Sequence, residues 1–341
     1  MLKLGVLDRQ RFLADPPRDL PGYIYHRFSR DRISFRLLRQ PTQTSPEDSK
    51  VFELLMLRVW LSNGTCRATF RRRFRNIDGI LNDLIAERFD RRADLIVEDM
   101  AGSACLTSTE WAETLLPRFP HIRFVASDLV LFLLEVEDSV EGTAFVLESD
   151  GSPLQYVRPP FVIRMQPPEP AALIVNWLLA WSARKQLKKI RAWWPLPESW
   201  LRDDEDGFLE IDRYRIRKLP LIHPEAWDLA HRDARFSIRQ HSVFEVCKEP
   251  RHVIRAMNVF NRSYFTTTQL SAGVRSIVES LHTGGIWIVG RTVVEEPPVH
   301  HVSVFQKSAC GGLDVIHRIG PGSEIEEIAT RASNSPPDKL D

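Results

Sequence analysis

The segment that decides the fold is Leu95-Ile96-Val97-Glu98-Asp99-Met100-Ala101-Gly102-Ser103-Ala104-Cys105-Leu106-Thr107-Ser108. It has the pattern of an apolar strand, an acidic residue, a run of small residues and a helix start. A second apolar strand over 122–126 follows and ends at Ser127-Asp128. In open α/β sheets a nucleoside ligand lies over such a turn, and a carboxylate beyond a neighbouring strand holds its ribose. Small residues let the backbone approach the ligand, and the helix N-terminus favours negative charge. The segment therefore predicts a nucleoside-containing cofactor.

Apolar strands and amphipathic helices alternate along the rest of the chain. The strand patterns cover 94–98, 122–126, 235–240, 252–257, 286–290, 299–305 and 313–318, and the helix patterns cover 107–117, 224–231, 268–282 and 322–330. Such alternation predicts an α/β fold with a mostly parallel sheet, right-handed crossovers and helices on both faces. The last two strands are close in sequence, so we expect them to form an antiparallel edge hairpin.

The same patterns predict three regions. Residues 1–90 are expected to form an N-terminal region that is irregular at first and helical over 46–90, ahead of a domain over 91–332. An insert of about 131–220 interrupts that domain with a hairpin pattern and a helix from Ala171 to about Trp194. The helix is apolar and then basic. We interpret it as a lid that packs on the core, although a helix on a membrane surface would look similar. Residues 333–341 are expected to be a disordered tail.

Composition argues against several classes of protein. The 341 residues include 46 Lys or Arg and 45 Asp or Glu, and this balance does not suit a protein that coats nucleic acid. The cysteines, at 66, 105, 247 and 310, form no CxxC pair, so neither a zinc site nor a disulfide framework is expected. The longest apolar run, near 171–181, is shorter than the roughly 20 residues that span a bilayer. We therefore expect a cytoplasmic protein with no membrane span and no metal.

Three segments resemble class I S-adenosylmethionine-dependent methyltransferases, and the chemotaxis-receptor methyltransferases most closely. Residues 101–105, Ala-Gly-Ser-Ala-Cys, are similar to that family's Ala-Cys-Ser-Thr-Gly cofactor turn. Residues 253–265 resemble its fourth-strand motif, and residues 281–290, with a Gly-Gly pair, resemble the turn before its fifth strand. The segments occur in the family's order. The resemblance implies a Rossmann-like methyltransferase sheet, S-adenosylmethionine as cofactor, and methyl transfer to an oxygen or nitrogen nucleophile.

The resemblance also implies which residues contact the cofactor. Carried over to this chain they are Asp99, Ala101, Gly102, Ser103, Asp128, Ser242 and Asn258. The chain departs from the family at Cys105, which occupies its second glycine position, and at Ser242, where the family usually has an acid. His241, at the end of the third core strand, is the candidate general base, although a carboxylate acceptor would need none.

Two alternative functions remain open. The departures at Cys105 and Ser242 would also suit a degenerate methyltransferase-fold protein that binds or regulates without catalysis. The basic and aromatic run from Arg67 to Arg75 would suit RNA methylation, although a solvated surface is the simpler interpretation and nucleic acid is not the expected partner. No motif identifies the methyl acceptor, which could be a small molecule or a protein, or the oligomeric state.

Overall fold

The computed structural model describes residues 5–13, 33–39, 46–67, 69–165, 174–202, 207–295 and 297–334, and the chain divides into two compact units. Unit 1 consists of residues 1–68 and 132–221, and unit 2 consists of residues 69–131 and 222–341. The predicted insert therefore falls in unit 1, and the segments that carry the methyltransferase resemblance fall in unit 2.

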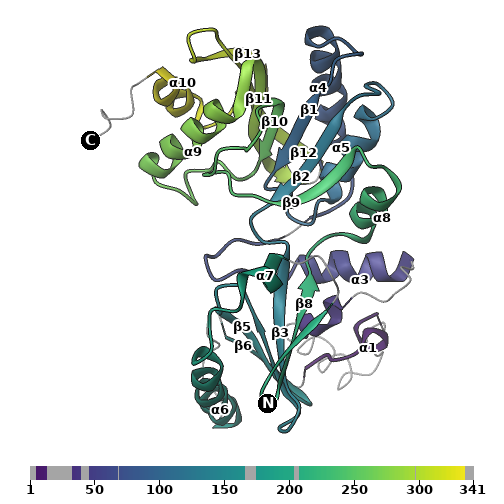
Figure 1. Cartoon of the computed structure of the whole chain (residues 1–341), viewed down its shortest axis with the longest axis vertical. Coiled ribbons are helices and arrows are strands. Elements are labelled where there is room, and N and C mark those ends of the chain that lie inside the picture. The colour runs from purple at the N-terminus through teal and green to yellow at the C-terminus, as the bar shows by residue number, and fades with distance from the viewer. Residues whose placement is uncertain are drawn as a thin grey trace. The chain divides into compact units, whose positions relative to one another are not determined.

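Unit 2 is built on a seven-stranded sheet in the order β13-β12-β11-β10-β1-β2-β9 (Figure 1). The strands are β1 (Ile96–Met100), β2 (Arg123–Asp128), β9 (Phe236–Gln240), β10 (Arg251–Met257), β11 (Leu281–Glu295), β12 (Pro298–Lys307) and β13 (Leu313–Ile319). The first five strands of the unit are parallel and have the spatial order 3-2-1-4-5, which is that of a doubly wound nucleotide-binding sheet. β12 and β13 are antiparallel, so the predicted parallel sheet with an edge hairpin is confirmed.

Helices cover both faces of this sheet, as predicted. On one face lie α4 (Arg75–Arg88), α5 (Leu106–Leu115) and α8 (Pro224–Arg232), and on the other lie α9 (Thr267–Ser280) and α10 (Glu326–Asn334). Side chains alternate between the two cores because successive strand residues point to opposite faces. Along β11, Ile286 and Ile288 pack in the α4–α5–α8 core, whereas Trp287 and Val289 pack in the α9–α10 core.

Unit 1 contains a second sheet, which is antiparallel throughout and has the order β6-β5-β4-β3-β8-β7. The strands are β3 (Phe132–Asp138), β4 (Thr143–Leu147), β5 (Pro153–Arg158), β6 (Phe161–Arg164), β7 (Phe208–Ile211) and β8 (Tyr214–Pro220). β4 and β5 form the predicted hairpin, and α6 (Ile174–Arg191) corresponds to the predicted helix. The insert contains more strands than predicted, because four further strands join the hairpin, and the short helix α7 (Glu198–Arg202) follows α6.

The N-terminal residues are divided between the two units, which differs from the predicted boundary at residue 90. Helices α1 (Arg9–Leu13), η1 (Phe35–Leu38) and α3 (Pro46–Met56) belong to unit 1, whereas α4 belongs to unit 2. The backbone N–H of Phe35 donates to Gln155 Oε1 at 2.8 Å, and Gln155 Nε2 donates to the carbonyl of Ile33 at 2.8 Å. These two hydrogen bonds hold residues 33–35 against β5. Ile77 and Leu81 instead pack α4 onto the parallel sheet.

The predicted disordered tail begins within α10, which includes residues 333 and 334; residues 335–341 lie outside the described residues. Among the helices of the described part of the chain, none combines the length and the hydropathy needed to cross a membrane.

Candidate functional site

The turn between β1 and α5 has an unusual backbone. Ala101, Ser103 and Cys105 have φ angles of +56°, +54° and +60°, and the two residues between them are not left-handed. A left-handed backbone costs a residue with a β-carbon roughly 1–2 kcal/mol. Strain of this kind persists where the surrounding structure enforces it, and it is concentrated at ligand sites. Alternation of right- and left-handed residues also forms a backbone concavity that suits anionic groups.

The neighbouring strand holds this turn in place. Asp128, the last residue of β2, accepts a hydrogen bond at Oδ2 from the Ser103 N–H at 2.8 Å. The Gly102 N–H donates to the carbonyl of Ser127 at 3.0 Å. A β-carbon on Gly102 would lie 2.6 Å from Ser108 Oγ, so a larger residue would displace the Ser108 hydroxyl from its hydrogen bond to Asp99. Asp128 and Gly102, both predicted as cofactor contacts, thus also maintain the shape of the turn.

Asp99, another predicted contact, belongs to a buried ion network. Arg255 of β10 donates from Nε to Asp99 Oδ1 at 2.7 Å and from Nη2 to Asp99 Oδ2 at 2.6 Å. Ser108 Oγ donates to Asp99 Oδ2 at 2.6 Å. Arg255 Nη1 donates to Asp78 Oδ1 of α4 at 2.8 Å, and the guanidinium carbon lies 4.0 Å from the ring centre of Trp111. Arg255 is completely buried.

In this network one guanidinium faces two buried carboxylates. Burial raises the pKa of Asp78 to about 7; the positive charge of Arg255 opposes this rise, and the negative charge of Asp99 adds to it. The network therefore favours a proton on Asp78 at mildly acidic pH.

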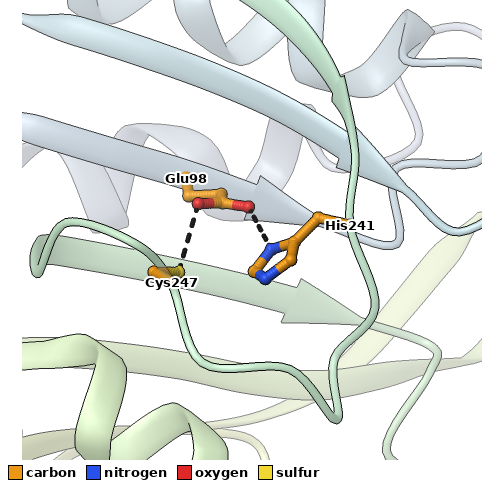
Figure 2. A group of neighbouring side chains, drawn as sticks. All are labelled: Glu98, His241 and Cys247. Carbon is orange, nitrogen blue, oxygen red and sulfur yellow. Dashed lines mark hydrogen bonds and ion pairs between the residues drawn. The ribbon is translucent and has the colours of Figure 1, made fainter. Parts of the chain in front are cut away.

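A second buried cluster surrounds Glu98, on the opposite face of β1 (Figure 2). Glu98 Oε1 lies 2.8 Å from His241 Nδ1 and accepts a hydrogen bond from Ser127 Oγ at 2.7 Å. Glu98 Oε2 accepts hydrogen bonds from Arg251 Nε at 2.7 Å and from Cys247 Sγ at 3.5 Å. Four donors from three other segments thus meet on one carboxylate that is only 1% exposed.

The charges of this cluster suit a hydrogen-bond network better than a metal site. The ligand atoms of Glu98, His241 and Cys247 lie within 4.8 Å of one another. Burial alone would raise the pKa of Glu98, but the hydrogen bonds from His241 and Ser127 and the charge of Arg251 hold it at about 2. Burial and the nearby Glu98 raise the pKa of the Cys247 thiol to about 11, which disfavours the thiolate that a metal requires. Arg251 already neutralises the carboxylate.

His241 lies directly after β9, and its backbone N–H donates to the carbonyl of Asp128 at 3.0 Å. An ionised Glu98 fixes the proton on Nδ1 of the neutral imidazole and leaves Nε2 as the acceptor. Among the described residues, none hydrogen-bonds to Nε2, and this atom is not one of the buried polar atoms. The candidate base is therefore oriented by a carboxylate and open to solvent.

Ser242 and Asn258 follow the carboxyl ends of β9 and β10. Ser242 Oγ accepts from the backbone N–H of Phe244 at 3.2 Å. Asn258, with φ of +62°, accepts at Oδ1 from the Thr292 N–H at 2.7 Å and so connects β10 to β11. Because the strands are parallel, all the predicted contacts lie at the carboxyl end of the sheet. The polar groups of several of these residues already have hydrogen-bond partners within the protein.

The sequence patterns did not identify Glu98 or Arg255 as members of these networks. Each is a charged residue in a strand whose residues are almost all buried, a position where charged side chains are rare unless paired. The sequence therefore contains a signal that these residues are paired, but it does not identify their partners, which lie on distant segments.

The Arg67–Arg75 run is occupied by contacts within the protein. Arg67 is 4% exposed, Arg71 Nη2 pairs with Glu225 Oε1 at 2.7 Å, and Arg73 lies 4.8 Å from the ring centre of Phe70. These contacts favour the structural interpretation of the run over RNA contact.

Replacing Ala101 with glycine should stabilise unit 2, because glycine removes the left-handed strain. We expect Ala101→Gly to raise the free energy of unfolding by about 0.5–1 kcal/mol. The control is Ala272→Gly, in the middle of α9 and likewise half-buried, which should lower it by about 1 kcal/mol. Urea unfolding measures both, and a loss of stability in Ala101→Gly would contradict the assigned backbone.

Comparison with known proteins gives results at the level of structure only. No protein-family model matches the chain, and no curated protein matches it. Among solved structures, the N-methyltransferase NodS from Bradyrhizobium japonicum WM9, in complex with S-adenosylhomocysteine, is 12% identical, with a TM-score of 0.27 over 64% of this chain and 62% of that chain. CalS10, an amino pentose methyltransferase from Micromonospora echinaspora bound to S-adenosylmethionine, is 11% identical, with a TM-score of 0.28 over 75% of this chain and 80% of that chain.

The chain resembles S-adenosylmethionine-dependent methyltransferases. The [4+2]-cyclase SpnF is also similar, at 12% identity and a TM-score of 0.26 over 62% of this chain and 44% of that chain. The chain spans less than two thirds of the length of the SpnF and NodS chains. Because the identities and TM-scores are low, the fold assignment rests on the strand order and register of unit 2, and the similar structures carry no argument about activity.

Proposed function

We propose that unit 2 binds S-adenosylmethionine at the carboxyl edge of β1 and β2 and transfers its methyl group to an oxygen or nitrogen acceptor. The observation that carries this proposal is the strained turn of residues 101–105. It follows the first strand of a sheet with the order 3-2-1-4-5, beside the point between β1 and β10 where the strand order reverses. Ligands of open α/β sheets bind at that point.

In this proposal the turn supplies backbone contacts and Asp128 supplies a carboxylate to the ribose. The Asp128 carboxylate accepts hydrogen bonds from the N–H groups of Ser103 and Val130, and each of its oxygens has two lone pairs, so it can accept further donors. Methyl transfer is a displacement that requires alignment of the nucleophile with the methyl group, so positioning supplies most of the catalysis. His241 would accept a proton from a hydroxyl or amine acceptor through Nε2.

A second candidate function is binding or regulation without catalysis. It is favoured by Asp99, because Arg255 and Ser108 already use the carboxylate that the resemblance assigns to the cofactor. It is also favoured by Asn258, whose side chain is occupied by the backbone of β11.

Thermal unfolding with S-adenosylmethionine, S-adenosylhomocysteine or NAD tests cofactor binding. A ligand at 100 times its dissociation constant should stabilise the protein by about 2.7 kcal/mol, and each kcal/mol should raise Tm by about 2–4 °C. We expect both S-adenosyl compounds to produce this shift and NAD to produce none. Asp128→Asn should weaken binding about tenfold, because one charge-assisted hydrogen bond is lost.

Asp83→Asn is the matched control, since Asp83 is a 72% exposed carboxylate of α4. It should leave the affinity unchanged. If millimolar S-adenosyl compounds do not shift Tm, cofactor binding is refuted. If binding occurs, candidate hydroxyl and amine acceptors can be screened with radiolabelled methyl donor, and His241→Asn should then abolish transfer to them while binding persists. Binding without transfer to any acceptor class would leave the second candidate function.

A further inference from the structure

Helix α6 of unit 1 has an inward face that packs on the antiparallel sheet and an outward face whose described side chains are exposed. Leu179, Leu187 and Ile190 point inward and are buried against the antiparallel sheet. Trp177 and Trp181 point outward and are 53% and 54% exposed. Among the α6 side chains that the structure describes, the packing therefore accounts for only about half of the apolar ones.

Leu178 is also exposed, at 50%, and completes an apolar patch with the two tryptophans over the first described turns of α6. In the sequence, this patch is preceded by the apolar residues 171–175. Large apolar side chains that gather on a surface mark an interaction site more often than chance. Tryptophan in particular favours the boundary between lipid and water.

The outward face becomes basic in the next turns. Arg184, Lys185, Lys188 and Lys189 are all exposed, and α6 contains neither Asp nor Glu. Residues 177, 181, 184 and 188 follow each other at helical spacing, so the apolar and basic parts form one continuous stripe. Lys185 Nζ lies 5.6 Å from the ring centre of Trp181, which joins the two parts.

We propose that this stripe, the outward face of α6, docks on the surface of a bilayer that contains anionic lipids. The tryptophans and Leu178 would enter the headgroup region, and the basic side chains would contact lipid phosphates and carboxylates. The exposed Leu178 suits lipid better than nucleic acid, whose bases stack on aromatic or guanidinium planes. The contact is peripheral and does not depend on methyl transfer.

Co-sedimentation of the full chain with vesicles tests this surface. The chain should bind vesicles of phosphatidylcholine with phosphatidylserine, and bind phosphatidylcholine alone much more weakly. Each basic side chain at an anionic surface multiplies the partition coefficient about fivefold, so a triple variant Lys185→Glu, Lys188→Glu, Lys189→Glu should lose more than about a hundredfold. Binding should also fall as salt increases.

A double variant, Trp177→Ser with Trp181→Ser, tests the apolar part and should lose binding even at low salt. Phe208→Ser is its control, since Phe208 is 56% exposed elsewhere on unit 1. Arg91→Glu, Arg92→Glu and Arg331→Glu together form the charge control, because all three side chains are exposed on unit 2. Every variant replaces exposed residues, so unfolding curves should match that of the parent chain.

Three outcomes would overturn the proposal. The first is vesicle binding that the α6 variants do not alter. The second is retention of single-stranded RNA, lost in the lysine variant, without vesicle binding. The third is a dimer, detected by light scattering, that the tryptophan variant dissociates while no vesicle is bound.

Discussion

Arg255→Leu should lower the free energy of unfolding by about 3–5 kcal/mol at neutral pH, because it leaves buried carboxylates without their partner. Arg255 is fully buried, and its guanidinium donates to both Asp99 and Asp78. Leucine would keep part of the packing on Trp111 but none of the charge. Urea unfolding of the variant and its parent measures the loss.

The loss should also depend on pH. Burial already raises the pKa of Asp78 to about 7, above its usual 3.8, and removal of Arg255 would raise it further. A carboxyl with a raised folded-state pKa binds its proton more tightly in the folded state, so stability falls as pH rises through this range. The deficit of Arg255→Leu should therefore be larger at pH 8 than at pH 5.

Arg123→Leu is the matched control for this prediction. Arg123 pairs with Glu249 at 2.6 Å, but the two side chains are 56% and 49% exposed. Exposed pairs contribute about 0–1 kcal/mol, so this variant should differ little from the parent. Equal losses in the two variants would show that the buried network around Arg255 is not formed as described.

Glu98→Leu should lower the free energy of unfolding by about 3–5 kcal/mol at neutral pH, because buried Arg251 would lose its buried counter-charge and keep only the exposed Glu249 at 4.0 Å. His241 and Ser127 would also lose the acceptor that they share. The imidazole would no longer be oriented, so the tautomer of His241, read by nitrogen NMR, should become mixed.

The stability of the parent chain should also depend on pH through the ionisation of Glu98. The pKa of Glu98 is held at about 2, below its usual 4.5. A depressed folded-state pKa stabilises the folded state above the unfolded value, and this contribution is lost as pH falls from 4.5 towards 2. About 3 kcal/mol is involved, at 1.36 kcal/mol for each unit, and the difference between Glu98→Leu and its parent should narrow over this window. Glu249→Leu removes an exposed carboxylate whose pKa is lowered mainly by its hydrogen bond from Arg123, and it should show a much smaller narrowing. A constant difference for Glu98→Leu would contradict the assigned charge.

The elements of unit 2 could be predicted from local pattern because each has a strong one. The strand patterns at 94–98, 122–126 and 252–257 correspond to β1, β2 and β10, and flanking small or polar residues mark their ends. The insert could be predicted only in part. β3 and β8 are far apart in the sequence, and each becomes a strand by pairing with the other along its whole length.

The candidate site could likewise be predicted only in part. A position for the site could be predicted, because the carboxyl ends of parallel strands meet at one edge of a sheet, and it stays a prediction. The partners of its side chains could not be predicted. Asp99 pairs with Arg255, which is 156 residues away in the sequence, and Glu98 pairs with Arg251, which is 153 residues away. Pairings over such long sequence separations produce no local pattern of residues from which they could be predicted.

The sequence by itself determined the order of strands and helices, the small-residue turn and its resemblance, because short-range sterics and hydrophobic periodicity act within a few residues. Only the tertiary structure decided the rest. It placed Ala101, Ser103 and Cys105 in left-handed conformations. It paired the two acids of β1, whose side chains point to opposite faces, with different arginines. It also left Trp177 and Trp181 facing outward. These outcomes depend on which distant segments pack together, and burial then sets the free energy of each charge and each exposed ring.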